Sequence, residues 1–478
     1  MNRKNSVFLT KCLTNAKKFA ASGLLEEESL IVNQGGRIMY KLLKKVKKIF
    51  RQAIRYIVTH PNEFTTSERF FTRKRKLTLE KVIGTIFSFT NSTLSSSIYD
   101  YLVVNLKSQF ATASAFIQQR KKIKLKVFEY IFNKIRDGLI ELCRPKRFYG
   151  MFILACDGSD FPMPTEVVPS DPGASGYSKV QNVLIHVNAL YDVLNHQYVG
   201  ITMEPKLKCS ERNELIVLAE KVAKDNSPYH PEECIILADR GYNGYHLLKV
   251  LSDMGYYFVF RITAENAETC ADCCGKVLVL PTSEKDIAET EGTLQLRKKK
   301  STGKYRRRFA KSADPERDAD LDIRIIAHVL QSGEIQFLIT NLPKDRIPVQ
   351  KLAALYKKRW HIETSFKHTK YHTRGLVVHS KQEVYQVMEI LASITLFNCV
   401  SFVIFHDPKT KNGLRDNRKI NFHETAHICI QQILKVGEIA KDINAMIYAN
   451  IVASRKGMIC PRGKDWNEKR AVDLQYRF

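Results

Sequence analysis

The sequence predicts an α/β fold, in which a mixed β-sheet with flanking helices lies between helical N- and C-terminal regions. Periodic apolar positions among basic residues extend to about residue 148, as amphipathic helices require. From Phe148 onward the period becomes that of extended strands, which alternate with helical segments. A chain of 478 residues can also bury a sizeable core divided between two or three domains.

The N-terminal region contains three segments with the apolar period of a helix. They are Tyr40 to Val58, Leu77 to Phe89 and Thr112 to Phe132. Thr78 and Asn91 are the expected boundary residues of the second helix, and Thr112 or Ser114 is the expected cap of the third.

Six apolar runs are predicted to form strands. They are Met151 to Ser159, Val183 to Val193, Gln197 to Glu204, Cys234 to Asn243, Tyr256 to Thr263 and Ile335 to Pro343. Asn195 is the natural hairpin turn between the second and third runs. Glu211 to Asp225 is predicted to be a helix. A long helix is expected to begin near Pro348, since proline suits a first turn.

The apolar run from Ile390 to Phe405 is predicted to be a buried core helix. It is shorter than the ~20 residues that span a bilayer, and it contains Asn398. Glu389 and His406 lie at its two ends. We therefore expect no association with a membrane.

The charge of the chain points to a polyanionic partner. There are 76 Lys and Arg residues against 49 Asp and Glu, which gives a net charge of +27. The excess is spread along the chain, whereas membrane-surface proteins more often concentrate it in one segment. Nucleic acid is therefore the expected partner, with a lysine-coated soluble surface as the alternative.

The eleven cysteines have no regular spacing and fit a reducing cytoplasm. Cys270, Cys273 and Cys274 have no clear second pair nearby, so a zinc site is not expected. The first residues lack the apolar core of a secretory signal. A cytoplasmic location is the resulting expectation.

Two predicted strands end on an aspartate: Asp157 lies before Gly158 and Ser159, and Asp239 lies before Arg240 and Gly241. Strand ends in α/β sheets hold catalytic groups rigidly beside solvent. An aspartate followed by glycine is also a common turn residue or helix cap. For either aspartate taken alone, that simpler interpretation is favoured.

The predicted helix from Leu352 to Tyr371 carries a third candidate group. At 100° per residue, four polar side chains fall within a stripe roughly 60° wide. They are Tyr356, Arg359, Glu363 and Lys370. A neighbouring apolar stripe can seat the helix on the sheet, and it consists of Leu355, Ile362 and Phe366. The alternative is a solvated helix face held by an Arg359–Glu363 pair.

In combination, these features resemble the bacterial insertion-sequence DDE transposases with a ribonuclease-H-like core. The shared features are the two aspartate motifs, a strand ending Thr-Asn-Leu-Pro, and the Y-R-E-K spacing from Tyr356 to Lys370. Phe70 to Ile83 and Ser114 to Ile123 also look like the N-terminal segments of that family. The resemblance covers roughly residues 65 to 400.

The resemblance implies a metal-dependent enzyme that cuts and rejoins DNA. Asp157, Asp239 and Glu363 would be its catalytic residues and would bind two Mg²⁺ ions, which Mn²⁺ can replace. Hard oxygen ligands suit these ions, and two metals assist phosphoryl transfer. The implied partners are double-stranded DNA, both element ends and target, and a second copy of the chain in a homodimer. The implied location is the bacterial cytoplasm, at the nucleoid.

Seven residues are expected to contact DNA. They are Tyr356, Arg359, Trp360, Lys370, Arg240, Arg306 and Arg307. Arg359 could bind a phosphate bidentately, and Lys370 could bind one as a point charge. Trp360 could stack on an unpaired base, or it could be a half-buried structural tryptophan.

The same resemblance, together with the pattern of elements, predicts five regions. They are a helical DNA-binding region (1–148), the first part of the catalytic core (149–263), a strand-rich basic insertion (264–333), the second part of the core (334–405), and a helical region for dimerisation or DNA contact (406–478). The basic run from Arg297 to Arg308 either lines the DNA or is a solvated charge run.

Two other functions are possible. One is a catalytically inactive, transposase-derived DNA-binding protein, and the other is a structure-specific nuclease on the same fold. The presence of all three acids argues against the first, and the Y-R-E-K spacing argues against the second.

Overall fold

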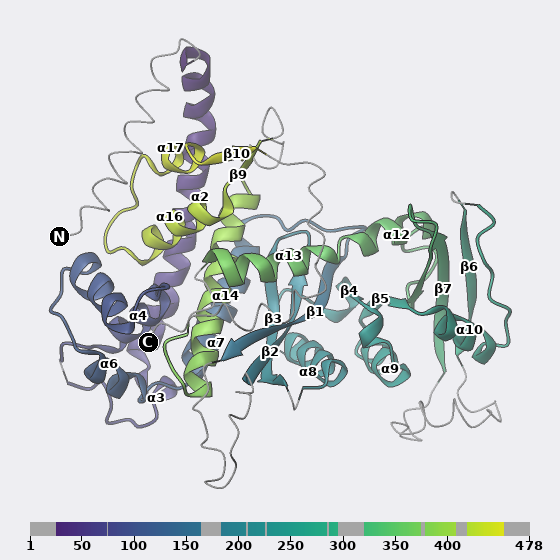
Figure 1. Cartoon of the computed structure of the whole chain (residues 1–478), viewed down its shortest axis with the longest axis horizontal. Coiled ribbons are helices and arrows are strands. Elements are labelled where there is room, and N and C mark those ends of the chain that lie inside the picture. The colour runs from purple at the N-terminus through teal and green to yellow at the C-terminus, as the bar shows by residue number, and fades with distance from the viewer. Residues whose placement is uncertain are drawn as a thin grey trace, which may run out of the picture. The chain divides into compact units, whose positions relative to one another are not determined.

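The computed structural model describes residues 25–73, 75–163, 183–206, 209–224, 227–283, 286–294, 320–373, 378–407 and 418–453 (Figure 1). Contacts between residues divide the chain into two compact units. Unit 1 comprises Met1–Cys143, Pro164–Asn182 and Lys367–Phe478, and unit 2 comprises Arg144–Met163 and Val183–Phe366. The five regions expected from the sequence stay a prediction, because the units group residues by contact and not by function.

Unit 2 is built on an eight-stranded mixed sheet. The strands are β1 (Phe152–Met163), β2 (Val183–Asp192), β3 (Gln197–Pro205), β4 (Cys234–Ala238), β5 (Tyr257–Ile262), β6 (Ile287–Leu294), β7 (Leu321–Val329) and β8 (Ile335–Thr340). Their order is β3-β2-β1-β4-β5-β8-β7-β6. Strands β1, β4 and β5 run parallel, and the other neighbouring pairs are antiparallel.

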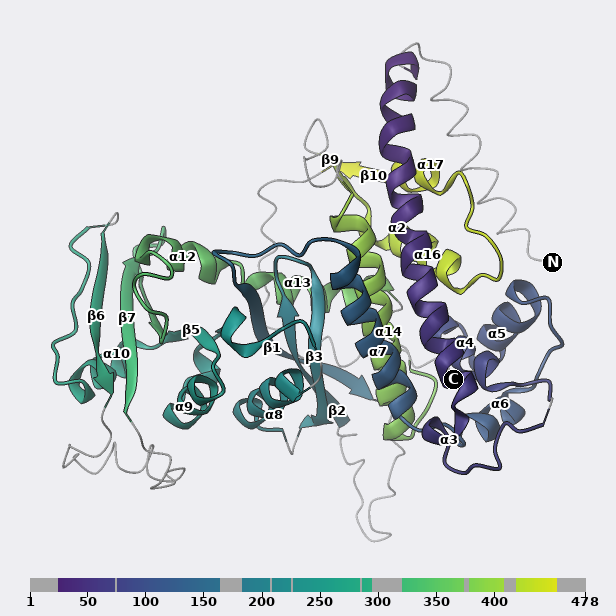
Figure 2. The ribbon, with the colours of Figure 1, turned by 180° about the vertical axis from the view of Figure 1, so that it is seen from behind.

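Helices cover both faces of this sheet (Figure 1). They are α8 (Glu211–Lys224), α9 (Tyr245–Asp253), α10 (Ala264–Cys273), α12 (Val349–Lys357) and α13 (Trp360–His368), with short turns η3 (Pro231–Glu233) and η4 (Arg240–Tyr242). Figures 1 and 2 show α8 and α9 on the face of the sheet opposite to α13. All five residues of β4 are buried, as expected for a parallel strand covered on both sides. The predicted mixed sheet with flanking helices is thereby confirmed.

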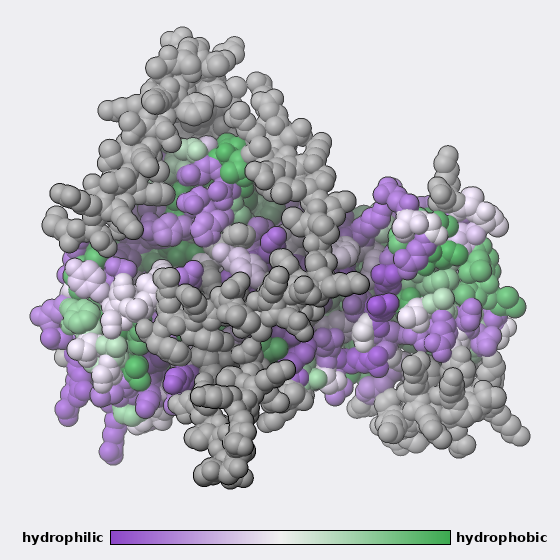
Figure 3. Space-filling view, in the orientation of Figure 1, coloured by the Kyte–Doolittle hydropathy of each residue, from purple (hydrophilic) through white to green (hydrophobic). Residues whose placement is uncertain are grey.

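The segment between β5 and β8 extends the same sheet. It begins with α10, which sequence periodicity did not predict. Thr263 caps this helix, and its side chain accepts a hydrogen bond from the backbone N–H of Asn266. Strands β6 and β7 then pair with each other, and β7 pairs with β8. Figure 3 shows apolar residues near these strands, and exposed Val277, Val279 and Leu280 lie between α10 and β6.

Unit 1 is helical. Its elements are α2 (Leu25–Thr59), α3 (Pro61–Phe64), α4 (Leu79–Ser88), α5 (Leu94–Tyr99), η1 (Asp100–Asn105), α6 (Ala113–Arg120), α7 (Lys126–Leu142), η6 (Thr369–Thr373), α14 (Glu383–Phe405), α16 (Phe422–Leu434), α17 (Ile443–Tyr448) and the strand pair β9 (Arg418–Ile420) and β10 (Ile451–Ala453). Helix α14 is long and apolar enough to cross a membrane, but 94% of its most apolar window is buried. The prediction of a core helix is confirmed.

A buried ion pair joins α6 to α14 inside unit 1. Arg120 Nη1 lies 2.7 Å from Glu389 Oε1, and their side chains are only 3% and 6% exposed. The backbone N–H of His379 donates to Glu389 Oε2 at 2.8 Å. Burial alone would raise the pKa of Glu389, but Arg120 and His379 outweigh it and hold that pKa below its ordinary value.

The single helix predicted from Thr112 to Phe132 is wrong. Thr112 does cap α6, as expected, but α6 ends at Arg120 and α7 begins at Lys126. Between them, Ile123 forms a β-bridge with Thr65, so backbone pairing with a distant segment replaces the helical hydrogen bonds.

Candidate active site

Asp157 lies inside β1 and not at its end. The strand continues to Met163, and Asp157 stands opposite Ala189 of β2. The parallel pairing of β1 with β4 stops at Ala155, opposite Leu237. Asp157 is thus the second residue beyond that pairing and still borders the carboxyl end of β4. The predicted turn after Asp157 is wrong.

Gly158 has a packing role that explains the missing turn. A Cβ atom at this position would lie 2.2 Å from Nε2 of His186, whose side chain is 2% exposed. The glycine therefore allows the close approach of the His186 ring to an extended backbone.

Asp239 directly follows β4, as the sequence predicts. It caps the short turn η4, where its Oδ1 accepts a hydrogen bond from Gly241 N at 2.8 Å. The neighbouring Arg240 is exposed. Asp239 therefore projects from a fixed backbone at the carboxyl end of a buried strand, where ligand groups commonly gather.

Arg359 joins two of the predicted acids. Its Nη2 donates to Glu363 Oε1 at 2.7 Å, and its Nη1 lies 3.5 Å from Asp157 Oδ2. Arg359 is only 7% exposed. The ion pair expected for a solvated helix face is present, but the interpretation of that face as solvated is wrong.

The helix that carries this pair is not continuous. Helix α12 ends at Lys357, α13 begins at Trp360, and a π-helix follows from Thr369. The break falls where the Arg359 side chain turns inward to the carboxylates. A regular stripe at 100° per residue therefore does not extend through the segment, although Leu355, Ile362 and Phe366 are buried as predicted.

Asp157 lies in an electrostatically strained position. Burial raises the pKa of Asp157 to about 6, and Arg359 opposes this shift. Glu363 and Asp239 raise the pKa further, so both carboxylates are close enough to act on Asp157. Asp157 thus feels the charge of both other predicted acids, and one guanidinium contacts Asp157 and Glu363.

The other predicted DNA contacts differ in their surroundings. Tyr356 is 5% exposed, and burial raises its pKa to about 12, so its phenol is neutral. Trp360 is 58% exposed beneath the guanidinium of Arg359, which excludes the half-buried structural role. Lys370 lies in η6 of unit 1. Arg306, Arg307 and the run from Arg297 to Arg308 lie outside the described residues.

The donor chemistry fits a hard divalent cation. The candidate ligands are carboxylate oxygens, which Mg²⁺ prefers, and the buried charge of Asp157 lacks full compensation. As they stand in the described part of the chain, no three Asp, Glu, His or Cys side chains converge closely enough to hold a metal. Arg359 lies between two of the acids and supplies the positive charge there.

Sequence reasoning missed a buried polar centre on β2. The Oδ1 of Asn188 accepts a hydrogen bond from Tyr242 at 2.8 Å, and its Nδ2 donates to the carbonyl of Glu211 at 3.3 Å. Cys156 also points at Asn188 Oδ1, at 3.6 Å. Asn188 thereby links Cys156, next to Asp157, and Tyr242, in the turn after Asp239, to the first residue of α8. The sequence feature that could have revealed this centre is the pair His186 and Asn188, at alternate positions of an otherwise apolar strand.

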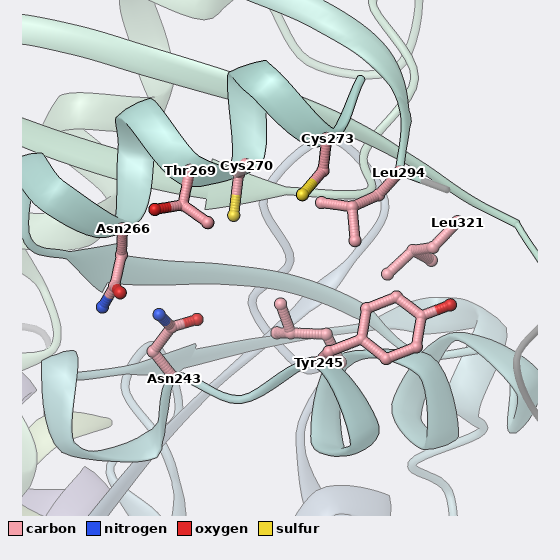
Figure 4. Close-up of a pocket in the computed structure, with 9 residues that line it drawn as sticks. Asn243, Tyr245, Asn266, Thr269, Cys270, Cys273, Leu294 and Leu321 are labelled. Atoms are coloured by element: carbon pink, nitrogen blue, oxygen red, sulfur yellow. The ribbon is translucent and has the colours of Figure 1, made fainter. Parts of the chain in front are cut away.

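A small pocket lies beside the turn that follows Asp239. Figure 4 shows Cys270 and Cys273 of α10 among its lining residues, with Asn243 and Tyr245 opposite them. Burial raises the pKa of Cys270 to about 12, so this thiol stays protonated and acts as an apolar lining group.

A family model described as a transposase DDE domain matches residues 150–399, more than half of the chain. The chain belongs to this DDE transposase family. The DDE domain includes Asp157, Asp239 and Glu363. No curated protein matches the chain significantly.

Solved structures of two transposases are similar in part. One is a cryo-EM structure of the piggyBac transposase synaptic complex with hairpin DNA, at 10% identity and a TM-score of 0.40, covering 92% of this chain and 84% of that one. The other is the crystal structure of a pre-cleavage Mos1 transpososome, at 10% identity and a TM-score of 0.16, covering 40% of this chain and 61% of that one.

Proposed function

We propose that the chain is a DNA transposase that binds the terminal inverted repeats of its element. It cleaves at the element ends by metal-dependent phosphoryl transfer and joins the 3′ hydroxyl ends to target DNA. One observation carries the proposal. Within a DDE transposase domain, Asp157 and Glu363 meet at Arg359, and Asp239 lies close enough to raise the pKa of Asp157.

In this proposal Asp157, Asp239 and Glu363 are the catalytic acids and the ligands of two divalent ions. Mg²⁺, or Mn²⁺ in its place, would supply positive charge to activate the attacking oxygen and stabilise the leaving one. Asp157 contributes because burial disfavours its isolated negative charge, which a nearby cation would compensate.

The cationic and aromatic residues of α12 and α13 suit a DNA end. Arg359 presents a planar guanidinium that already binds carboxylate oxygens, and the same donors fit a phosphodiester. Trp360 exposes a ring on which a base can stack. We further propose that Tyr356, Lys370, Arg240, Arg306 and Arg307 contact DNA, and that two copies of the chain hold two ends in a synaptic homodimer.

The deciding experiment is Glu363→Gln, which keeps side-chain size and removes the charge that a metal requires. On one labelled inverted-repeat duplex with Mg²⁺, we expect a normal mobility shift together with loss of both cleavage and joining. Asp157→Ala and Asp239→Ala should lose cleavage in the same way. The matched control is Glu220→Gln, which removes a surface carboxylate paired with Lys224 and should cut normally.

The outcomes separate the alternatives. Cleavage by Glu363→Gln would show that Glu363 is not the third acid. A wild-type protein that binds DNA but never cuts would indicate an inactive, transposase-derived binder. Cutting without joining would indicate a nuclease on the same fold.

A further inference from the structure

We propose that Glu211 is a fourth carboxylate of the active site, which binds a divalent cation together with Asp239. This inference rests on the proposed function and adds a residue to its metal site. Glu211 is the first residue of α8, and no sequence motif singles it out.

The two oxygens of Glu211 face the backbone beside both aspartates. A Cβ on Gly158, next to Asp157, would lie 3.4 Å from Glu211 Oε1. A Cβ on Gly241, two residues after Asp239, would lie 3.7 Å from Glu211 Oε2 and 3.1 Å from Asp239 Oδ1. One oxygen of Glu211 and one of Asp239 therefore lie within 3.7 Å of the same point at Gly241.

Two buried polar side chains, His186 and Asn188, hold Glu211 in position. His186 lies between Asp160 and Glu211, with its Nδ1 2.6 Å from Asp160 Oδ1 and its Nε2 3.4 Å from Glu211 Oε1. Its Nε2 is fully buried and makes no well-directed hydrogen bond within the described residues. It is aimed at the carboxylate of Glu211, and Asn188 holds the backbone carbonyl of the same residue.

The neighbouring Asp160 is paired with two side chains, whereas the carboxylate of Glu211 has, in the described part of the chain, only the 3.4 Å contact with His186. Asp160 binds both His186 and Lys206, and these contacts outweigh its burial and lower its pKa. Among the described residues, Oε2 of Glu211 accepts no hydrogen bond, and the side chain is 40% exposed. A preorganised carboxylate with a free oxygen, open to solvent and beside another carboxylate, suits a hard cation.

A simpler role for Glu211 is to stabilise the N-terminus of α8, which favours acidic side chains. Glu214 lies in the same first turn and can serve that role equally. It therefore provides a matched control, since Glu214→Gln removes the same charge from the same turn of the helix.

The test is equilibrium binding of Mn²⁺ alone to the full chain without DNA, measured by calorimetry and by the electron paramagnetic resonance signal of free Mn²⁺. Loss of a ligand or its supporting group typically weakens metal affinity about 10- to 100-fold. We expect a loss of this size for Glu211→Gln, little change for Glu214→Gln and partial recovery for Glu211→Asp. Circular dichroism in EDTA should show that each variant is folded.

Failure of this proposal can be told apart from failure of the proposed function. Wild-type Mn²⁺ affinity in Glu211→Gln, with affinity lost in Asp239→Asn, would remove Glu211 from the metal site and leave the proposed function intact. Wild-type affinity in both variants would overturn the metal site itself. A lower unfolding temperature of Glu211→Gln in EDTA, with unchanged Mn²⁺ affinity, would assign Glu211 a purely structural role.

Discussion

Asp157→Asn should make the metal-free protein more stable. Burial holds the pKa of Asp157 at about 6 in the folded chain, against 3.8 for an ordinary aspartate. The charged form is therefore disfavoured by roughly two pKa units, or about 3 kcal/mol at 1.36 kcal/mol per unit. Asparagine keeps the shape of the side chain, carries no charge, and leaves the 2.7 Å pair between Arg359 and Glu363 in place.

The effect should depend on pH in a definite direction. Below pH 4, Asp157 is protonated in both the folded and the unfolded chain, so the wild type and the variant should be equally stable. Between pH 4 and 6 the unfolded chain ionises first, and the wild type loses stability. Above pH 6 the difference should level off at no more than about 3 kcal/mol in favour of the variant.

Urea unfolding in EDTA, at several values between pH 4 and 8, measures this difference. The control is Asp345→Asn, which removes an exposed carboxylate between β8 and α12 and should change stability by less than about 0.5 kcal/mol. A variant less stable than the wild type at pH 8, or a gain that does not shrink toward pH 4, would refute the reasoning.

Three further predictions concern packing and charge. Gly158→Ala should cost about 1–3 kcal/mol, measured by thermal unfolding, because the added Cβ overlaps the buried His186 ring; unchanged stability would mean that the ring can move aside. Glu389→Gln should cost about 3–5 kcal/mol in urea unfolding, since it leaves Arg120 buried without its partner, whereas the exposed Glu383→Gln should be nearly neutral. DNA affinity, followed by fluorescence anisotropy, should fall steeply with salt because of the +27 charge; a flat dependence would assign that charge another purpose.

Six of the eight strands and the position of Asp239 follow from the sequence, because apolar runs of strand length mark them. The role of Gly158 does not. The pair Asp-Gly is typical of a turn, but here the glycine leaves room for the ring of His186. Only the pairing of β1 with β2 brings this ring next to Gly158. The residues around Gly158 in the sequence therefore do not predict that contact.

The candidate site was predictable only in part for the same reason. Asp157, Arg359 and Glu363 meet as the spacing suggests. The break between α12 and α13 falls at Arg359, whose side chain contacts Asp157 about two hundred positions earlier, and helical periodicity does not predict such a contact. Glu211 and Asn188 have no motif, since their importance depends on side chains contributed by other strands.

The position of β8 between β5 and β7 has a consequence for synthesis of the chain. Strand β8 joins β5 only after roughly seventy intervening residues have been made, and closing a loop of that length is slow. Until then β5 is an edge strand with unpaired backbone groups, which favours aggregation. A nascent or truncated chain that stops before β8 would contain both aspartates but lack Glu363. On the proposed function, such a chain would therefore lack its third catalytic acid until the sheet can be completed.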